Sequence, residues 1–410
     1  MEVITQALSW WSRLQPYRSE RLRCKNYTYG RQWNDMVTAE NGRRITEEQY
    51  IREQGSAPLK NNLIRKIVRN VLGVFRNNYT IPTYADLAPS LPDYIKNTDQ
   101  ATLKALYERT VRENSLAEIY SRVLEEYLIG GMAVVRKRFS TERGGRVTTD
   151  MVRPDSFFYN TDAVDPRGRD IHTIGEIHSA AEGSGGGTVY EIWRRETDGE
   201  WHYHFIDDRG ATICRGRSPF PSGCHPYVMK AYPLIDGEIH SFVADCIDQQ
   251  RYINRLITMN DWIIRSSAKG VLLFPESAIP DDLTLEDLAD QWARYNGVIR
   301  YKARAGMPLP QQVATNATNV GISELLEVQL KMMEDVSGIN AALQGQLSSG
   351  AVSGTLYEQQ TRHAMTGLSD ILEGFRVFMA ESGRKDLDLI QLIDTSEHNL
   401  PAWDTTDKAK

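Results

Sequence analysis

The amino-acid sequence predicts an α+β fold, because the spacing of its apolar residues changes twice along the chain. Over the first ~130 residues apolar side chains recur every three or four positions, which indicates amphipathic helices. Between about residues 133 and 232 the period becomes two, as in half-buried strands separated by turns. From about residue 238 the helical period returns. A β-rich segment enclosed by helical parts is typical of the α+β class.

The helical start contains two strongly patterned segments. Residues 63–75 form one apolar stripe, and a second helix is expected over residues 99–129, ending at Gly130 and Gly131 because glycine suits a helix C-terminus. A solvated face and a face turned to nucleic acid both explain the cations around the first stripe, and the solvated face is favoured. These cations are Lys60, Arg65, Lys66, Arg69 and Arg76.

The central segment reads as strands at residues 132–139, 189–195 and 201–206, with glycine-containing turns between them. Between the strands, residues 183–187 read Gly-Ser-Gly-Gly-Gly, which is the composition of a flexible linker. A short natural loop and a spliced linker both remain open, and splicing is slightly favoured.

A long amphipathic helix is expected over residues 238–268, and at 1.5 Å per residue it would measure roughly 45 Å. An ordinary helix in a bundle core would share this pattern. Its polar side mixes positive and negative charges, as expected where identical helices pack side by side. The predicted subunit-contact residues on this side are Asp248, Arg251 and Arg255.

A short module follows at residues 271–313, and it contains an acidic helix near residues 281–290 and a strand at residues 297–302. Asp281 or Asp282 is expected to cap the helix, whose early acids favour the helix dipole. A metal site would also need carboxylates, but this arrangement is that of an exposed first turn. Another helix is expected at residues 322–336, then an uncharged loop of small residues and amides at residues 344–354.

Composition and motifs exclude several classes of function. A formal net charge of −6 argues against a protein that grips DNA through many phosphates. The sequence has no phosphate-binding Gly-x-x-x-x-Gly-Lys-Ser/Thr loop, no Gly-x-Ser-x-Gly elbow and no His-Glu-x-x-His motif. Surface or packing roles are expected for His202, His204 and the adjacent Cys224 and His225, because no third ligand has useful spacing. No enzyme activity, cofactor, metal or membrane span is therefore expected.

The order of two helices bracketing a small module, then a flexible loop, resembles the stem, clip and tunnel loop of tailed-bacteriophage portal proteins. The segments that carry the resemblance are residues 225–227, 237–243, 249–255, 353–354 and 359–360, with weaker likeness at residues 27–33 and 153–160. The resemblance implies a portal-like subunit of the α+β class with a helical and β wing, a two-helix stem, a small clip and a tunnel loop. The implied divisions are 1–237 wing, 238–270 stem helix, 271–313 clip, 314–338 second stem helix, 339–354 tunnel loop, and 355–410 wing or crown-base helix and tail.

The resemblance also implies roles for particular residues. A net-negative stem face would line the channel through Glu324, Glu327, Lys331 and Glu334, and would repel DNA mildly. The tunnel loop would touch DNA through Gln344, Gln346, Ser348, Ser349 and Ser353. The clip would dock the terminase and adaptor through Asp281, Asp282, Glu286, Asp287 and Arg300.

The implied function is a ring at one capsid vertex, twelvefold in the family, through which double-stranded DNA is packaged and ejected independently of its sequence. Its expected partners are further copies of itself, the large terminase subunit, the major capsid protein and a head–tail adaptor. It would reside in the virion after assembly in the host cytoplasm, which suits four scattered cysteines. A DNA-processing nuclease or recombinase and a non-ring virion adaptor are the alternatives.

Overall fold

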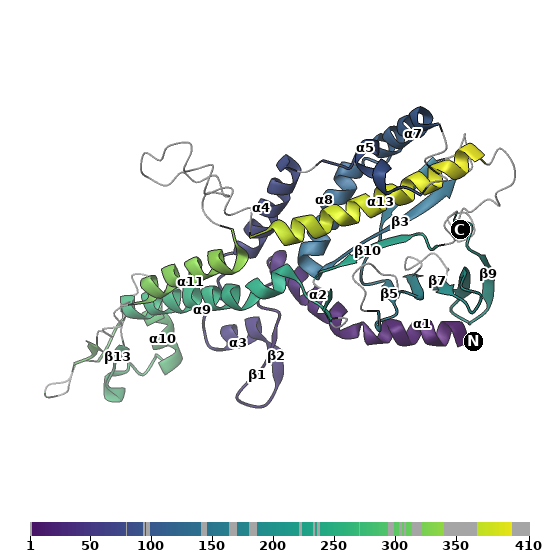
Figure 1. The fold of residues 1–410 in the computed structure, drawn as a ribbon. Coiled ribbons are helices and arrows are strands. Elements are labelled where there is room, and N and C mark those ends of the chain that lie inside the picture. Colours follow the sequence, from purple (N-terminus) through teal and green to yellow (C-terminus); the bar gives the residue numbers. More distant parts are fainter. Residues whose placement is uncertain are drawn as a thin grey trace, which may run out of the picture. The chain divides into compact units, whose positions relative to one another are not determined.

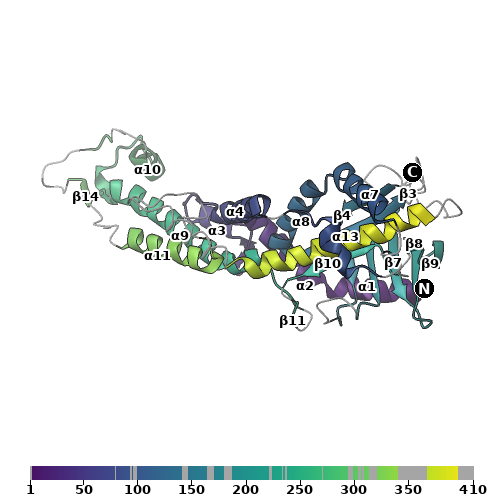
Figure 2. The same cartoon turned by 45° about the horizontal axis from the view of Figure 1, so that its top comes forward.

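The computed structural model divides the chain into two compact units (Figures 1 and 2). The first unit contains Met1–Asp35, Asn62–Gln250 and Met332–Lys410, and the second contains Met36–Asn61 and Arg251–Lys331. The structure describes residues 2–78, 80–92, 95, 99–140, 146–163, 170–179, 187–220, 224–232, 234–235, 238–269, 271–293, 299–302, 306, 309–313, 321–339 and 367–395. The mixture of helices and sheets confirms the α+β prediction.

Helices form much of the first unit. They are α1 (Glu2–Arg13), α2 (Gln15–Thr28), α4 (Leu63–Asn78), α5 (Tyr84–Leu87), the 3-10 helix η1 (Ala88–Ser90), α7 (Gln100–Glu113), α8 (Leu116–Gly130) and α13 (Ser369–Thr395). Two further helices, α9 (Phe242–Lys269) and α11 (Ile322–Ser337), each have one part in this unit and one part in the second.

Two antiparallel sheets complete the core of the first unit. One has the order β10-β3-β4, from Tyr227–Ala231, Met132–Ser140 and Arg146–Met151. The other is a meander of β5 (Phe157–Tyr159), β6 (Thr173–His178), β7 (Val189–Arg195), β8 (Trp201–Asp207) and β9 (Thr212–Arg217). A short pair joins β11 (Leu234–Ile235) to β12 (Glu238–Ile239). The three predicted strands at residues 132–139, 189–195 and 201–206 are thus confirmed.

The core of the first unit is built on both sheets. Helix α1 packs against the meander, where Trp10 joins a cluster with Phe157 and Trp193. Helix α13 packs against β3, β4 and β10. Its Phe375 stacks on Phe378 with ring centroids 5.4 Å apart. Such aromatic burial supplies much of the hydrophobic stabilisation of a core.

A fully buried ion pair also joins α13 to the three-stranded sheet. The Nζ atom of Lys137 in β3 lies 2.7 Å from Oδ2 of Asp386, and neither side chain is exposed to solvent. Lys137 also donates to the hydroxyl of Thr149, 2.8 Å away. Two charges withdrawn from water need this mutual pairing, because each alone would carry a large desolvation cost.

The helix predicted over residues 99–129 is two helices, so that prediction was wrong. Helix α7 ends at Glu113, and Ser115 adopts a left-handed conformation with φ 50° before α8 begins. The side-chain amide of Asn114 donates to the carbonyls of Thr110 and of Val147, and the contact with Val147, 33 residues away, fixes the break. The predicted end is correct: α8 stops at Gly130, and a Cβ atom on Gly131 would lie 2.0 Å from the carbonyl oxygen of His240.

The predicted start of the long helix was also wrong. Glu238 and Ile239 form strand β12, and the helix begins four residues later, at Phe242. The hydroxyl of Ser241 accepts hydrogen bonds from the backbone of Val243 and Ala244, as a helix N-cap does. The same hydroxyl donates to the carbonyl of Ile129 at 2.6 Å, so contacts with α8 set the helix start.

The second unit has shorter elements around parts of α9 and α11. They are β1 (Met36–Thr38), β2 (Arg44–Thr46), α3 (Glu47–Glu53), β13 (Val271–Leu273), the 3-10 helix η2 (Glu276–Ala278), α10 (Leu285–Ala293) and β14 (Gln311–Val313). β1 pairs with β2, and β13 pairs with β14. The strand predicted at residues 297–302 is not formed over residues 299–302, and the last strand of this module is β14 instead. Residues 36–61, which lie within the predicted wing, cluster with the second unit.

None of the described helices is both long enough and apolar enough to cross a bilayer.

Candidate functional site

Polar side chains at intervals of four residues anchor the chain to α9. The side-chain oxygen of Gln250, in the first unit, accepts hydrogen bonds from the backbone of Leu63 and Ile64. In the second unit, Asn254 accepts from the backbone of Asn61 at 3.1 Å, and Thr258 accepts from the backbone of Leu59 at 3.1 Å. These residues were not predicted from the sequence. The signal for them was three hydrogen-bonding side chains at positions 250, 254 and 258 on the otherwise apolar face of the helix.

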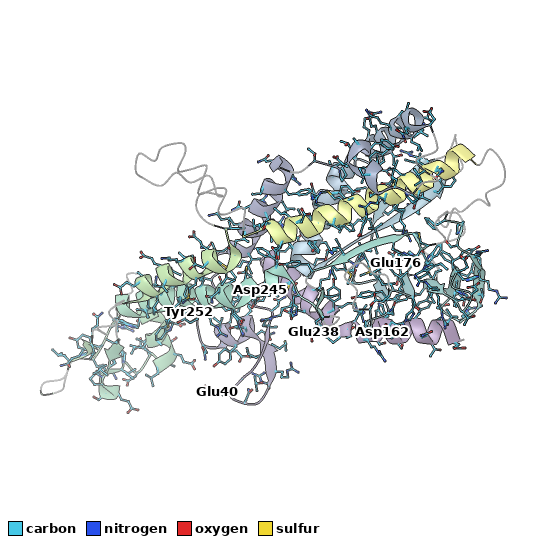
Figure 3. The ribbon with its side chains drawn as sticks, in the orientation of Figure 1. Glu40, Asp162, Glu176, Glu238, Asp245 and Tyr252 are labelled. Carbon is cyan, nitrogen blue, oxygen red and sulfur yellow. The ribbon has the colours of Figure 1, made fainter. Side chains whose placement is uncertain are left out.

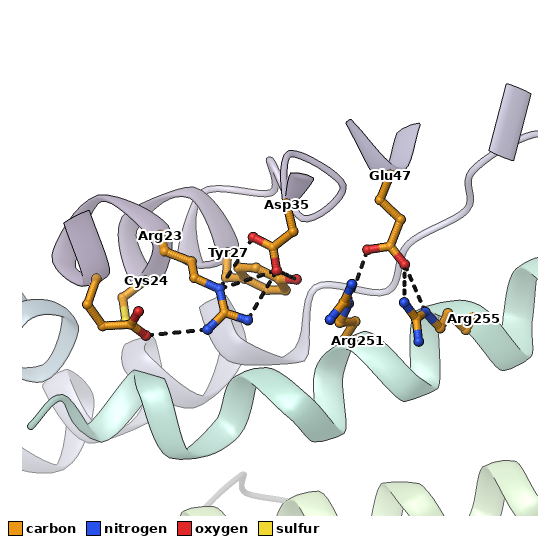
Figure 4. A network of polar contacts seen from close by, with 8 residues as sticks. Arg23, Cys24, Tyr27, Asp35, Glu47, Arg251 and Arg255 are labelled. Atoms are coloured by element: carbon orange, nitrogen blue, oxygen red, sulfur yellow. Dashed lines mark hydrogen bonds and ion pairs between the residues drawn. The ribbon is translucent and has the colours of Figure 1, made fainter. Parts of the chain in front are cut away.

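Glu47 binds two of the three arginine and aspartate residues predicted at the subunit contact (Figure 4). Arg251 donates its Nε–H to Glu47 at 3.1 Å, and Arg255 donates its Nε–H at 2.8 Å. The Glu47 side chain is only 4% exposed, while Asp248 lies on the surface. A carboxylate withdrawn from water in this way is stabilised by charged donors. The arginines thus hold α3 on α9 within one chain, a partner that the sequence pattern did not reveal.

The four residues predicted to face a channel lie on one face of α11. At about 100° per residue, Glu324, Glu327, Lys331 and Glu334 fall within an arc of roughly 80°. All four are exposed. Three carboxylates and one ammonium make this face net negative, which would repel a phosphate backbone.

Some charged side chains of the module at residues 271–313 form ion pairs within that module. Arg300 pairs with Asp282, and Lys302 pairs with Asp281. Neither aspartate caps the acidic helix, so the predicted N-cap was wrong. Thr284 is the cap: its hydroxyl accepts from the backbone of Asp287 at 3.1 Å, and the Asp287 carboxylate accepts in return from the backbone of Thr284 at 3.0 Å.

This capping box also favours the ionised form of Asp287, because the hydrogen bonds from Thr284 lower the pKa of its carboxyl group. Asp281, Asp282, Glu286 and Asp287 are all exposed, as a docking surface requires.

A different acidic cluster in the first unit has the composition of a metal site. Ligand atoms of Glu176, His178 and Glu191 lie within 4.8 Å of one another, and Figure 3 labels Glu176. The guanidinium of Arg136 lies among them. Its Nη1 is 2.9 Å from Glu191 and 3.3 Å from Glu176. The positive charge that a metal would supply is therefore supplied by arginine, which joins β3 to β6 and β7.

The pKa values of the two carboxyl groups in this cluster move in opposite directions. Burial raises the pKa of Glu176. Burial also opposes ionisation of Glu191, but the hydrogen bond with His178 and the charge of Arg136 outweigh it and lower its pKa to about 2. Glu191 therefore stays ionised beside Arg136 at neutral pH.

The histidines named in the sequence take part in packing contacts. His225 lies edge-on against Trp201, with ring centroids 4.7 Å apart. Burial lowers the pKa of His204 despite the nearby carboxylate of Glu196. His202 and Cys224 are half-buried. The loop residues Gln344, Gln346, Ser348, Ser349 and Ser353 lie outside the described residues, as do residues 183–186 of the glycine-rich segment.

Comparison with known families identifies the class of protein. The chain matches the family of phage P22-like portal proteins over residues 6–184 and 176–408, nearly its whole length, and it belongs to that family. The two matched segments overlap at residues 176–184, which include the first two of the glycine-rich residues 183–187.

Family membership makes this chain a bacteriophage portal protein. Portal proteins are structural proteins that form multimeric rings at the virion capsid vertex, where DNA passes. The alternatives of a DNA-processing enzyme and a non-ring adaptor are not favoured. A search of curated proteins found no match to the chain.

Proposed function

We propose that twelve copies of this chain close into a ring, with α9 and α11 as the stem and the acidic face of α11 toward the channel. The observation that carries this proposal is the shared exposed face of Glu324, Glu327, Lys331 and Glu334. A ring of net-negative helices would repel double-stranded DNA mildly and keep it from sticking while it moves. The base sequence of the DNA would not matter, because no side chain would recognise the bases.

Charge reversal on α11 tests the channel assignment. Glu324→Lys together with Glu327→Lys should leave rings intact but slow packaging, with partial recovery at higher salt, because each added cation creates a salt-dependent contact with phosphate. The matched control is Glu40→Lys, an exposed reversal in the turn between β1 and β2. Packaging at the unmodified rate in the α11 variant would contradict the assignment.

The module at residues 271–313 is proposed as the clip that docks the large terminase subunit and then the head–tail adaptor. In support, β13 pairs with β14 at its base, and the acidic helix α10 lies between these strands in the sequence. The proposed docking residues are Asp281, Asp282, Glu286, Asp287 and Arg300.

A deletion between β13 and β14 distinguishes a loss of terminase docking from a loss of ring assembly. Removing residues 280–301 keeps both β13 and β14, so rings should still form, while binding of the terminase in a pull-down should be lost. Full binding by the deleted protein would contradict the clip assignment. Alanine at Asp282 and Glu286 gives a milder variant of the same experiment.

The uncharged residues 344–354 are proposed as the tunnel loop, in which many weak contacts hold DNA against backflow. Ser348→Lys plus Ser349→Lys should permit ring assembly but slow packaging, with partial recovery at higher salt. Normal packaging by this double variant would remove the loop from the DNA path.

The same proposal places residues 1–237 in the wing and residues 355–410 in a crown-base helix and tail. The major capsid protein would contact the assembled ring, and assembly would take place in the host cytoplasm. Mass photometry of the purified protein measures the number of subunits directly. A purely monomeric protein would favour the non-ring adaptor instead.

A further inference from the structure

The turn between β7 and β8 brings two histidines and two carboxylates together. His202 and His204 lie two positions apart on β8, so their side chains share one face of the sheet, in which β7, β8 and β9 are neighbours (Figure 2). Glu196 follows β7 and contacts both rings, with Oε1 3.4 Å from Nε2 of His204 and Oε2 3.9 Å from Nδ1 of His202. Oδ2 of Asp198 lies 3.8 Å from Nε2 of His202. Spacing in the sequence offered these histidines no third ligand, but the turn supplies one.

Imidazole and carboxylate groups together form the ligand set of a divalent transition-metal ion. Imidazole suits Zn²⁺, Ni²⁺ and Cu²⁺, and zinc sites often combine two histidines with a carboxylate. With zinc–ligand bonds of about 2.0–2.2 Å, neighbouring ligand atoms of a tetrahedral site are roughly 3.4 Å apart. The contact between Glu196 and His204 already has this separation, and the 3.8 Å contact between Asp198 and His202 is slightly longer.

Each ring has its Nε2 atom available for a metal ion. Burial lowers the pKa of His204, so its imidazole stays neutral, and its Nε2 is buried without a hydrogen-bond partner among the described residues. Nδ1 of His202 lies 3.3 Å from the carbonyl oxygen of Glu200. A proton on this Nδ1 atom leaves the lone pair on Nε2. A metal-binding histidine usually has its second nitrogen held by a protein group in this way.

The charges around this turn differ from those of the acidic cluster around Arg136. In that cluster arginine already supplies the positive charge. Within the described part of the chain, no lysine or arginine forms an ion pair with Glu196 or Asp198, and both carboxylates contact histidine instead. Arg215 lies opposite His204 on β9, where its charge also lowers the pKa of that histidine. The side chain of Arg215 is exposed and can turn into the solvent when a cation binds.

We propose that the turn between β7 and β8 binds one Zn²⁺ or a similar divalent transition-metal ion per chain, through the Nε2 atoms of His202 and His204 and the carboxylates of Glu196 and Asp198. These ligand atoms are not yet within 4.8 Å of one another. The two carboxylate side chains, 43% and 52% exposed, can close around the ion without disturbing the core. The ion would tie residues 196–200 to β8. Because all four ligands belong to one chain, the site does not depend on the proposed ring.

Calorimetric titration of ZnCl₂ into the purified, chelator-treated protein tests the proposal, and one Zn²⁺ should bind per chain. Glu196→Gln and His202→Asn should each weaken binding at least tenfold, since even loss of an outer-shell partner costs roughly 10–100-fold in metal affinity. His240→Asn is the matched control, because His240 is an exposed imidazole 3.5 Å from a single carboxylate, and it should leave the affinity unchanged. Absence of Zn²⁺ binding by the unmodified protein would overturn the proposal, as would unchanged affinity in either ligand variant.

Two further measurements locate the ion. Arg215→Gln should tighten Zn²⁺ binding, because it removes a positive charge beside the site, whereas Arg209→Gln in the next turn should not. The melting temperature of the unmodified protein should rise with added Zn²⁺, and that of Glu196→Gln should not, since a ligand that binds the folded state stabilises it. Zn²⁺ binding that persists in Glu196→Gln but is lost in Glu176→Gln would place the ion in the cluster around Arg136 and overturn the proposal.

Discussion

The first unit and the second unit each contain a buried carboxylate that contacts arginine, but the structure around this carboxylate differs between the two units. Glu191 in the first unit and Glu47 in the second are each nearly inaccessible to solvent and each contact arginine. Around Glu191 lie two sheets, α1 and a dense aromatic core. Around Glu47 lie a two-stranded hairpin and parts of two helices, with apolar side chains left exposed nearby.

This difference indicates how stability is distributed. The first unit buries its apolar side chains against its own sheets, so it is expected to be stable without contacts to other copies. Among its described residues the second unit has only two-stranded pairings, and such hairpins are marginal unless something packs on them. A subunit that assembles can leave such surfaces open, because a partner can cover them in the assembly. Four substitutions test this contrast.

The largest effect is expected at the buried pair Lys137–Asp386. Lys137→Met should cost about 3–5 kcal/mol of unfolding free energy, because it leaves the carboxylate of Asp386 buried without its cation. Chemical denaturation of the monomer measures this. The double variant Lys137→Met with Asp386→Leu should recover most of the loss, since no buried charge remains. A double variant no more stable than the single one would show that packing rather than charge decides this site.

Glu191 should give a pH-dependent effect in the first unit. Its pKa in the folded chain is about 2, below the unfolded value of about 4.3, so its contribution is present above pH 4.3 and is lost as pH falls toward 2. Glu191→Gln should therefore cost roughly 3 kcal/mol near neutral pH and little near pH 2. Unfolding curves of both proteins between pH 2 and pH 6 measure the difference. A constant difference across that range would contradict this ionisation argument.

Glu47→Gln should act locally in the second unit. Two charge-assisted contacts are weakened, each worth about 1.5–3 kcal/mol, so residues 36–54 should exchange amide hydrogens faster. The first unit should keep its protection. Glu53→Gln is a matched control on the same helix, because its pair with Arg43 is exposed. Loss of protection throughout the first unit in Glu47→Gln would break the contrast between the two units.

The smallest effect is expected at Arg300. Its pair with Asp282 is exposed on both sides, so Arg300→Ala should change stability by only about 0–1 kcal/mol. The melting temperature should stay within error, while terminase binding would fall if the clip proposal is correct. A large drop in melting temperature would mean that this pair is a structural support of the module.

Local patterns were enough to predict the α+β class, the strands β3, β7 and β8, and the helices at α4 and α11. Apolar period and glycine position are properties of neighbouring residues, and they identify elements without knowledge of the fold. The acidic face of α11 could also be predicted, since residues 324, 327, 331 and 334 share a face in any helix. The break at Ser115 and the start of α9 at Phe242 could not, because Asn114 and Ser241 are held by groups far away in the sequence.

By itself, then, the sequence determined which segments are helical or extended, which helix faces are apolar or acidic, and the resemblance to portal proteins that the family match confirms. Only the tertiary structure decided which charges are already paired. Arg251 and Arg255 were predicted from the helix pattern to meet a neighbouring subunit, yet Glu47 of the same chain, some 200 residues earlier, binds both of them. The physical reason is that helical period depends on neighbours along the chain, whereas burial and ion pairing depend on segments that only folding brings together.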